Sequence, residues 1–336
     1  MARRYGIIEL PRSIESAVSN AKLAEAVGFD WVGVADTQSI AREVYVVCAM
    51  IAAATRTVMV GPCVTNPLTR HPAVAASAIA SVNEVAQGRA LLGIGSGDSA
   101  VLNLGAHPSG LAKLERTVQA LRGLLKGRSC EWEGQSIHAS WIEESVPVYV
   151  SAEGPKTLEL AGEFADGVIC GLGITPEAAA LCFHHLGVGA RRAGRRLEDI
   201  DVWALARVNV VDDEEAALDE IRMELASMAH HAFRFTQQGK GVPPQFADGI
   251  RRIQQGYQPR HHEALGESPN AELMQARQLL GYLASRFAVL GSPQRCAERI
   301  EQIHTAGFEQ ILFTGFVAER PRLIRRLGEE VFSHLR

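Results

Sequence analysis

The sequence lacks the features that mark several large classes of protein. Among its 336 residues the longest uninterrupted apolar run is Val44–Ala54, 11 residues, which is too short to span a bilayer and is typical of a buried helix. The formal net charge is only −4, so there is no excess of positive charge to bind a polyanion. With 47% hydrophobic and 21% charged residues, disorder and a fibrous protein are also excluded. We therefore expect a globular protein that binds neither nucleic acid nor membrane.

Cysteine is scarce and scattered. The six cysteines form no CxxC pair. This usage is typical of reduced thiols in a cytoplasm rather than of a disulfide framework or a zinc site. The N-terminal segment has no sustained apolar stretch before Glu9 and Pro11, which argues against a secretory signal. Both observations predict a cytoplasmic protein.

Several catalytic motifs are also missing. The segment 93–98 resembles a dinucleotide fingerprint, but Asp98 stands where the last glycine is required. The segment 154–157 has proline where a P-loop needs glycine, and no GxSxG elbow appears. Adjacent histidine pairs such as His261–His262 point about 100° apart on a helix, so both rarely reach one ion. We therefore predict no metal site.

The sequence does contain a regular alternation of short apolar segments with helical ones. Most strand-like segments are apolar on successive residues, which is expected of strands buried on both faces. Because nearly all are followed by a helical pattern, the strands are expected to be parallel. We predict an α/β fold, a (β/α)8 TIM barrel, with an open doubly wound sheet as the alternative. The eight predicted strands are 5–10, 31–35, 58–64, 90–95, 146–152, 167–170, 202–211 and 310–314.

One segment, 229–284, does not follow this alternation. It is polar and rich in turns, and it lies between the seventh and eighth units. Such a stretch is either a lid over the C-terminal ends of the strands or an insertion that faces a partner. Four of its aromatic residues could line a substrate pocket or only pack the insertion against the barrel; they are Phe233, Phe235, Phe246 and Tyr257. We predict a single domain, 1–336, with 229–284 as an insertion or lid within it.

The clearest anion site of the sequence is the segment 150–157. A strand ends at Ala152, Gly154 turns the chain, and Pro155 stands near the first helical position. The helix N-terminus would present free N–H groups and a partial positive charge beside Lys156. These residues predict a phosphate site, and the alternative is a well-capped helix with a surface lysine.

Polar residues also follow the first three predicted strands. Asp36 follows the second strand and Glu9 lies near the end of the first, so both are expected to face the same mouth of the barrel. Either could be a general acid or a hydrogen-bonding group, and the alternatives are a helix cap or a salt bridge. In the loop after the third strand, Arg70 and His71 could bind an anion, or form a salt bridge and cap the next helix.

Together these loops resemble the luciferase-like superfamily of flavin-dependent oxidoreductases, in particular the branch of methylenetetrahydromethanopterin reductase. Four segments carry the resemblance: 28–36, 60–101, 146–169 and 290–313. The resemblance implies a (β/α)8 barrel with insertions. It further implies a flavin-type ring at the C-terminal mouth, with the phosphate tail at the loop after the fifth strand.

The same resemblance implies roles for individual residues. The third strand would carry a non-prolyl cis peptide at Cys63–Val64 beneath the ring, and Asp36 matches an acidic position after the second strand. Members often have His where this chain has Thr37, and Glu9 is shifted by one residue from the family carboxylate, so the pterin substrate is not carried over. The expected catalytic residues are Asp36 and Glu9. The expected cofactor-binding residues are Cys63, Val64, Thr65, Asn66, Gly97, Asp98, Glu153, Gly154, Pro155, Lys156 and Thr157.

The implied function is hydride transfer between a deazaflavin or flavin cofactor, coenzyme F420 or FMN, and a small organic substrate. FMN would also permit an alternative, monooxygenation with reduced flavin and oxygen. A non-catalytic luciferase-like binding subunit or a metal-dependent hydrolase would be a further alternative function. A homodimer is expected by family analogy, and the small-residue helix predicted over 73–86 would permit close packing of helices.

Overall fold

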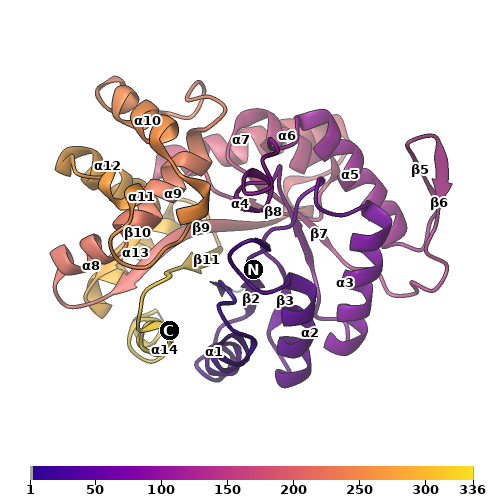
Figure 1. The fold of residues 1–336 in the computed structure, drawn as a ribbon, viewed down its shortest axis with the longest axis horizontal. Coiled ribbons are helices and arrows are strands. Elements are labelled where there is room, and N and C mark those ends of the chain that lie inside the picture. The colour runs from indigo at the N-terminus through magenta and orange to yellow at the C-terminus, as the bar shows by residue number, and fades with distance from the viewer. Residues whose placement is uncertain (1–2, 336) are drawn as a thin grey trace.

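Eight parallel strands form a nearly closed barrel (Figure 1), and the computed structural model describes residues 3–335. Residues 1, 2 and 336, which the predicted domain 1–336 includes, lie outside the described residues. The strands pair in the order β3-β2-β1-β11-β9-β8-β7-β4, and bridges between residues 60 and 90 and between 65 and 94 join the two ends. The predicted barrel is confirmed, and each predicted strand overlaps one barrel strand. These are β1 (Arg4–Glu9), β2 (Trp31–Val34), β3 (Met59–Pro62), β4 (Leu92–Ile94), β7 (Val148–Ala152), β8 (Gly167–Cys170), β9 (Asp201–Val210) and β11 (Gln310–Thr314).

Helices cover the outside of the barrel. The side chains of Ser13, Thr175 and Ser292 each accept a backbone N–H at a helix start, which satisfies a group that the helix leaves unpaired. None of the helices within residues 3–335 is long and apolar enough to cross a membrane. The helices that connect successive barrel strands include α1 (Ile14–Ala26), α2 (Val44–Ala54), α3 (Pro72–Ala86), α5 (Leu111–Leu124), α6 (Pro155–Phe164), α7 (Pro176–Arg192), α8 (Glu214–Glu220), α9 (Arg222–Phe233) and α13 (Pro293–Thr305).

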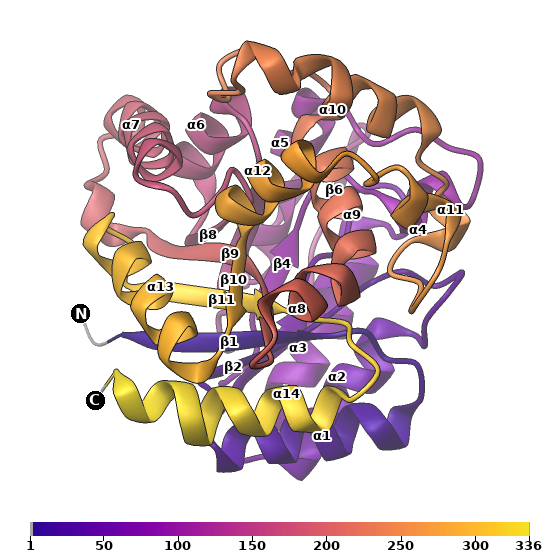
Figure 2. The same cartoon turned by 90° about the vertical axis from the view of Figure 1, so that its left-hand side faces the viewer.

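Several short elements were not anticipated. Strands β5 (Cys130–Trp132) and β6 (Gln135–Ile137) form an antiparallel hairpin that projects from one side of the barrel (Figure 1). The C-terminal helix α14 (Arg320–Arg325) runs alongside α1 (Figure 2). The remaining short helical turns are α4 (Ser99–Leu102), η1 (Leu197–Asp199), η3 (Arg326–Val331) and η4 (Phe332–His334).

The segment 229–284 is largely helical. After α9 it contains α10 (Pro244–Gly256), η2 (Pro259–His261), α11 (Pro269–Glu272) and most of α12 (Arg277–Phe287). The short strand β10 (Ala288–Gly291) then pairs with β9. Helices α10, α11 and α12 gather on the side of the barrel opposite the β5–β6 hairpin (Figure 1). Helix α10 is largely polar and buries only three residues, Gly249, Ile250 and Ile253.

The four aromatic residues expected either to line a pocket or to pack the insertion do not line a pocket. Phe233 is fully buried in the core, and Phe246 stacks on Tyr282 with ring centroids 4.4 Å apart. Tyr257 stacks on His230 at 4.1 Å, whereas Phe235 is 62% exposed. The pocket-lining alternative is therefore wrong for all four, because three pack within the protein and the fourth faces solvent.

The interior of the barrel is filled unevenly along its axis. Trp31 and Trp203 meet edge to face, with ring centroids 5.0 Å apart, and Tyr149 packs against Trp31. Toward the C-terminal ends of the strands the side chains are smaller, for example Gly95 and Ser151. The bulky layer closes one end, and the small residues leave space at the other.

Candidate functional site

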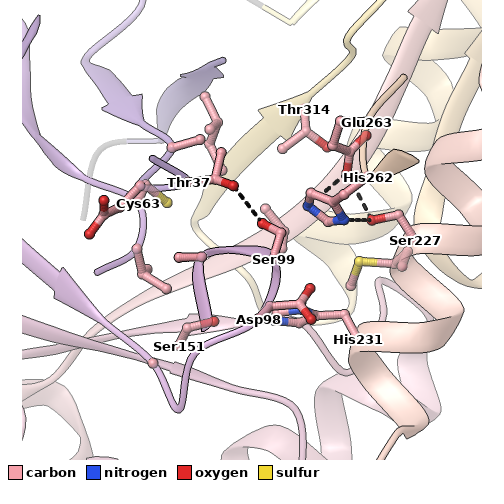
Figure 3. Close-up of a pocket in the computed structure, with 18 of the residues that line it drawn as sticks. Thr37, Cys63, Asp98, Ser99, Ser151, Ser227, His231, His262, Glu263 and Thr314 are labelled. Atoms are coloured by element: carbon pink, nitrogen blue, oxygen red, sulfur yellow. Dashed lines mark hydrogen bonds and ion pairs between the residues drawn. The ribbon is translucent and has the colours of Figure 1, made fainter. Parts of the chain in front are cut away.

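A cavity opens at the C-terminal ends of the barrel strands, and it measures about 940 Å³ when its open mouth is included. Its floor is apolar and is formed by Ile8, Val64, Ile169 and Leu205. Polar side chains surround this floor, among them Thr37, Ser99 and His231 (Figure 3). In (β/α)8 barrels this end of the strands is where active sites lie.

The wall formed by β3, β4 and their loops is built from close backbone contacts. The Cys63–Val64 peptide bond is cis, as the family resemblance implied. Asn66 lines the cavity, and its side-chain oxygen accepts the N–H groups of residues 68 and 69, which fixes the loop. Gly97 has a φ of +98°, and a Cβ there would lie 2.6 Å from Val101 Cγ2, so the turn requires glycine.

Asp36 lines the cavity, but both of its oxygens are already bonded. Arg70 Nη1 lies 2.6 Å from Oδ2, and the Thr65 hydroxyl donates to the same oxygen at 2.7 Å. The second guanidinium nitrogen of Arg70 binds Oδ1 at 3.4 Å and Glu43 at 2.8 Å. His71 accepts the Ala73 N–H at the start of α3. The structure thus favours the salt-bridge interpretation of Asp36 and Arg70 and the capping interpretation of His71.

Glu9 does not face the cavity, contrary to the expectation that both carboxylates share one mouth. Side chains alternate along β1, so Ile8 points into the barrel and Glu9 points out toward the surrounding helices. There it accepts the Asn20 amide at 3.1 Å and pairs with Arg320 at 3.5 Å. Burial raises the pKa of this carboxyl, against the effect of Arg320.

A charged network joins the loops after β4 and β7 to α9. His231 lies between two carboxylates, with Nδ1 3.0 Å from Asp98 Oδ2 and Nε2 3.2 Å from Glu153 Oε1. Arg234 binds Asp98 at 2.7 Å and Ser96 at 2.9 Å, and Ser151 donates to Glu153 at 2.9 Å. Within residues 3–335 no group of three or more His, Cys, Asp or Glu side chains is placed to hold a metal ion.

The pKa shifts in this network keep its members charged. Burial alone would lower the pKa of His231, but the Glu153 and Asp98 carboxylates raise it to about 9. Burial likewise opposes ionisation of Glu153, but His231 lowers the pKa of that carboxyl to about 2. Arg234 and His231 hold the pKa of Asp98 far below its usual range, again against burial. Both carboxylates and the imidazolium are therefore charged at neutral pH.

A second network lies on the side formed by β9 and the 229–284 segment. Arg207 lies between Glu224, at 3.1 Å, and Glu263, at 3.2 Å, and Ser227 donates to Glu263 at 2.8 Å. Burial raises the pKa of Glu224 to about 7, because repulsion from Glu263 adds to burial and Arg207 only partly opposes them. The Phe316 N–H also donates to Glu224, at 2.7 Å.

The predicted phosphate loop lies at the start of α6, where a second lysine approaches it from the 229–284 segment. Gly154 precedes the helix and supplies no side-chain cap, whereas Lys156 is exposed. All four expected residues Gly154, Pro155, Lys156 and Thr157 lie outside the cavity lining. Lys240, from the 229–284 segment, is buried and donates to the Ala232 carbonyl at 2.5 Å. A Cβ on Gly154 would lie only 3.5 Å from Lys240 Nζ. Burial lowers the pKa of Lys240 to about 8.

Comparison with known proteins agrees with this architecture. The sequence profile of the luciferase-like monooxygenase family matches residues 3–310. The chain belongs to this family. The family resemblance found in the sequence is therefore confirmed.

Relatives of known activity match over most of their length. The chain is 29% identical to a 5,10-methylenetetrahydromethanopterin reductase of Methanolobus tindarius, over 93% of this chain and 94% of that protein. It is 27% identical to an F420-dependent glucose-6-phosphate dehydrogenase of Nakamurella multipartita, over 85% of this chain and 80% of the relative. Oxidoreductase is the reaction class that the family and these relatives share, as the sequence predicted.

The solved structure of a coenzyme F420 dependent reductase has the same fold as this chain. The coenzyme F420 dependent tetrahydromethanopterin reductase of Methanopyrus kandleri superposes with a TM-score of 0.77 at 24% identity, with all of both chains covered. At this identity the likeness concerns the barrel and not the substrate.

Sequence reasoning missed the charged and polar residues of β9, α9 and the 229–284 segment that lie at or beside the cavity. Four of them share one face of α9 and its C-terminal cap, because they recur at intervals of three or four residues: Glu224, Ser227, His231 and Arg234. That spacing was the signal that could have found them. It was overlooked because the boundary drawn at residue 229 divides the helix. The other missed residues are Arg207, Lys240 and Glu263.

Proposed function

We propose that this protein transfers hydride between coenzyme F420 and a small organic substrate. The observation that carries the proposal is the arrangement of the cavity. Its apolar floor, which includes Val64, lies at the same end of the barrel as the start of α6, which no side chain caps. A planar ring system suits such a floor, and a phosphate suits free N–H groups at a helix start.

The residues present fit a tricyclic ring with an anionic tail. Most of the cofactor-binding residues expected from the sequence line the cavity and would contact the ring: Cys63, Val64, Asn66, Gly97, Asp98 and Glu153. The start of α6 would bind the phosphate with its backbone N–H groups, and Lys240 would supply the cation expected from Lys156. Thr65 and Asp36 would support the wall through their mutual hydrogen bond.

When bound, a deazaflavin supplies a ring carbon that accepts or releases a hydride. The chain provides the surroundings for that step. The apolar floor excludes water from one face of the cavity, which strengthens electrostatic interactions within it. His231 and Arg234 keep Asp98 and Glu153 ionised, so these two side chains bind and orient groups rather than donate protons at neutral pH.

Cofactor binding provides the direct test. Trp31 and Trp203 lie in the barrel below the cavity floor, so a chromophore bound there would quench their fluorescence. We expect saturable quenching by F420 at micromolar concentrations, followed by oxidation of reduced F420 when a suitable carbonyl, imine or enone acceptor is added. Absence of binding by either F420 or FMN would contradict the proposal.

FMN is the second candidate cofactor, because the family that contains this chain is named for monooxygenases. The two cofactors share a ring shape and a phosphate, and they differ in reactivity toward oxygen. Parallel titrations with F420 and FMN, followed by oxygen-consumption measurements with reduced FMN, distinguish the two activities. Tighter binding of FMN with substrate-dependent oxygen uptake would favour the monooxygenase.

The protein is further proposed to act as a homodimer through α2 and α3. These adjacent helices expose four apolar side chains to solvent: Val46, Met50, Val74 and Val85. Covering them would bury apolar surface that a lone monomer leaves in water. Light scattering after size-exclusion chromatography checks the oligomeric state, and Met50→Glu with Val74→Glu should shift it toward monomer.

We also propose a cytoplasmic location. All six cysteines are free, which supports this location.

A further inference from the structure

Two buried oxygen atoms in the cavity wall lack a hydrogen-bond partner among residues 3–335. They are Glu263 Oε2 and Thr314 Oγ1. Both residues line the cavity, and Figure 3 shows them on the same side of it. The Glu263 side chain is 3% exposed, and Thr314 is 2% exposed. Buried polar atoms without partners are unfavourable in a folded protein, so a ligand that pairs with both would remove that cost.

Glu263 is also held in an unusual backbone conformation. Its φ is +54°, in the left-handed region that residues other than glycine seldom adopt. The Arg12 guanidinium donates to its carbonyl oxygen at 2.6 Å, and Ser227 and Arg207 both bind Oε1. These contacts fix the residue and leave Oε2 as its free acceptor. Backbone strain of this kind is concentrated at ligand-binding sites.

The charges around the cavity favour a cation over an anion. Arg207 is paired with Glu224 and Glu263, and Arg234 is paired with Asp98, although each arginine keeps one buried Nε–H without a partner. His231 lies between Asp98 and Glu153. A dianionic phosphate ester would therefore meet neutralised arginines and nearby carboxylates. A protonated nitrogen would find a free carboxylate oxygen.

We propose that Glu263 and Thr314 form a subsite for a protonated nitrogen of the substrate, so that the protein acts on amine-bearing molecules rather than phosphate esters. This inference depends on the proposed function only in identifying the ligand as the substrate. An ammonium group carries three N–H donors, of which one would bind Glu263 Oε2 and another Thr314 Oγ1. Hydrogen bonds between charged partners are about twice as strong as neutral ones.

Three probes that share one ring test the subsite: benzylammonium, benzyl alcohol and benzyl phosphate. Each is titrated into the protein, with and without F420, and binding is followed by tryptophan fluorescence and thermal shift. We expect benzylammonium to bind more tightly than the other two. Glu263→Gln and Thr314→Val should each weaken its binding, the former by roughly tenfold or more. The matched control is Glu267→Gln, an exposed carboxylate of the same segment, which should leave affinity unchanged.

Each outcome supports or overturns the subsite. Equal benzylammonium affinity in wild type and Glu263→Gln would overturn it, as would tighter binding of benzyl phosphate or no benzylammonium binding at all. If Glu263→Gln fails to fold, Thr314→Val decides, because removing an unpartnered hydroxyl should not reduce stability. Since the probes are also titrated without cofactor, a failure of F420 binding would contradict the proposed function and leave the subsite result standing.

Discussion

The two sides of the cavity are built from contacts of very different range. On the side of β2, β3 and β4, Asp36 bonds to Thr65 and Arg70, which are 29 and 34 residues away. On the other side, Asp98 bonds to His231 and Arg234, which are 133 and 136 residues away. The first side is a frame that consecutive βα units build by themselves. The second exists only because the 229–284 segment and α9 fold back over the barrel.

This difference predicts that the two sides contribute unequally to the free energy of unfolding when a charged side chain is removed. The frame around Asp36 holds a single buried carboxylate, which would keep the hydrogen bond from the Thr65 hydroxyl if Arg70 were lost. The networks around Arg207 and His231 hold several buried charges together, and removal of one leaves another without compensation. The following experiments test that contrast, beginning with the largest expected effect.

Replacing Arg207 should cause the largest loss of stability. Arg207→Met leaves Glu224 and Glu263 buried beside each other without their shared cation, and we expect the free energy of unfolding to fall by about 3–5 kcal/mol. The matched variant Arg70→Met should cost only about 1–3 kcal/mol, because Asp36 keeps its bond to Thr65. Urea denaturation at pH 7 measures both. Equal losses would show that the two sides do not differ in this respect.

The stability of the protein should fall as the pH rises from 6.5 to 9. The pKa of His231 is about 9 in the folded protein against 6.5 ordinarily, so the folded state holds this proton more tightly. Its contribution, up to about 3 kcal/mol, is complete below pH 6.5 and is lost as the pH approaches 9. For Glu153, whose pKa is lowered to about 2 from 4.5, the contribution is lost as the pH falls from 4.5 toward 2.

Urea denaturation at pH 6, 7, 8 and 9 measures the first of these effects. Its control is His231→Gln, which cannot titrate and should show a flatter profile across that range. Identical slopes for the variant and the wild type would assign the pH dependence to another group.

Lys240 and Lys156 should differ in their effect on cofactor affinity. Lys240→Met removes the buried ammonium beside Gly154 and is expected to weaken F420 binding roughly tenfold. Lys156→Met, which changes an exposed side chain at the same helix start, should alter the affinity by less than about twofold. Fluorescence titration with F420 gives both dissociation constants. A larger loss of F420 affinity in Lys156→Met than in Lys240→Met would support Lys156, the residue expected from the sequence.

The smallest effect is expected from Glu9→Gln. The side chain lies outside the cavity and pairs with Arg320, which also donates to the carbonyls of residues 8 and 315. We expect a loss of about 1 kcal/mol in the free energy of unfolding and an unchanged F420 dissociation constant. A clear change in F420 affinity would show that Glu9 contributes to the cofactor site.

The contrast also explains which predictions succeeded. The strands were found because each is a short apolar segment that reveals its own burial, and the loop 63–66 after β3 was placed at the cavity by resemblance. Glu9 was misplaced because a strand points successive side chains to opposite faces, so a one-residue difference moves a carboxylate out of the barrel. Lys156 was named as the cation because it is adjacent in sequence to the helix start, whereas Lys240 reaches the same place only through the fold.

The sequence by itself determined the barrel, the family and the position of the mouth, because alternating apolar periods and short loops are local properties of the chain. Only the tertiary structure decided which charges meet at that mouth. Closure of the barrel and packing of α9 bring Asp98, Glu153 and Arg207 within reach of partners that no spacing in the sequence connects. Electrostatic pairing depends on distance in space, and for these residues that distance is set by the fold as a whole.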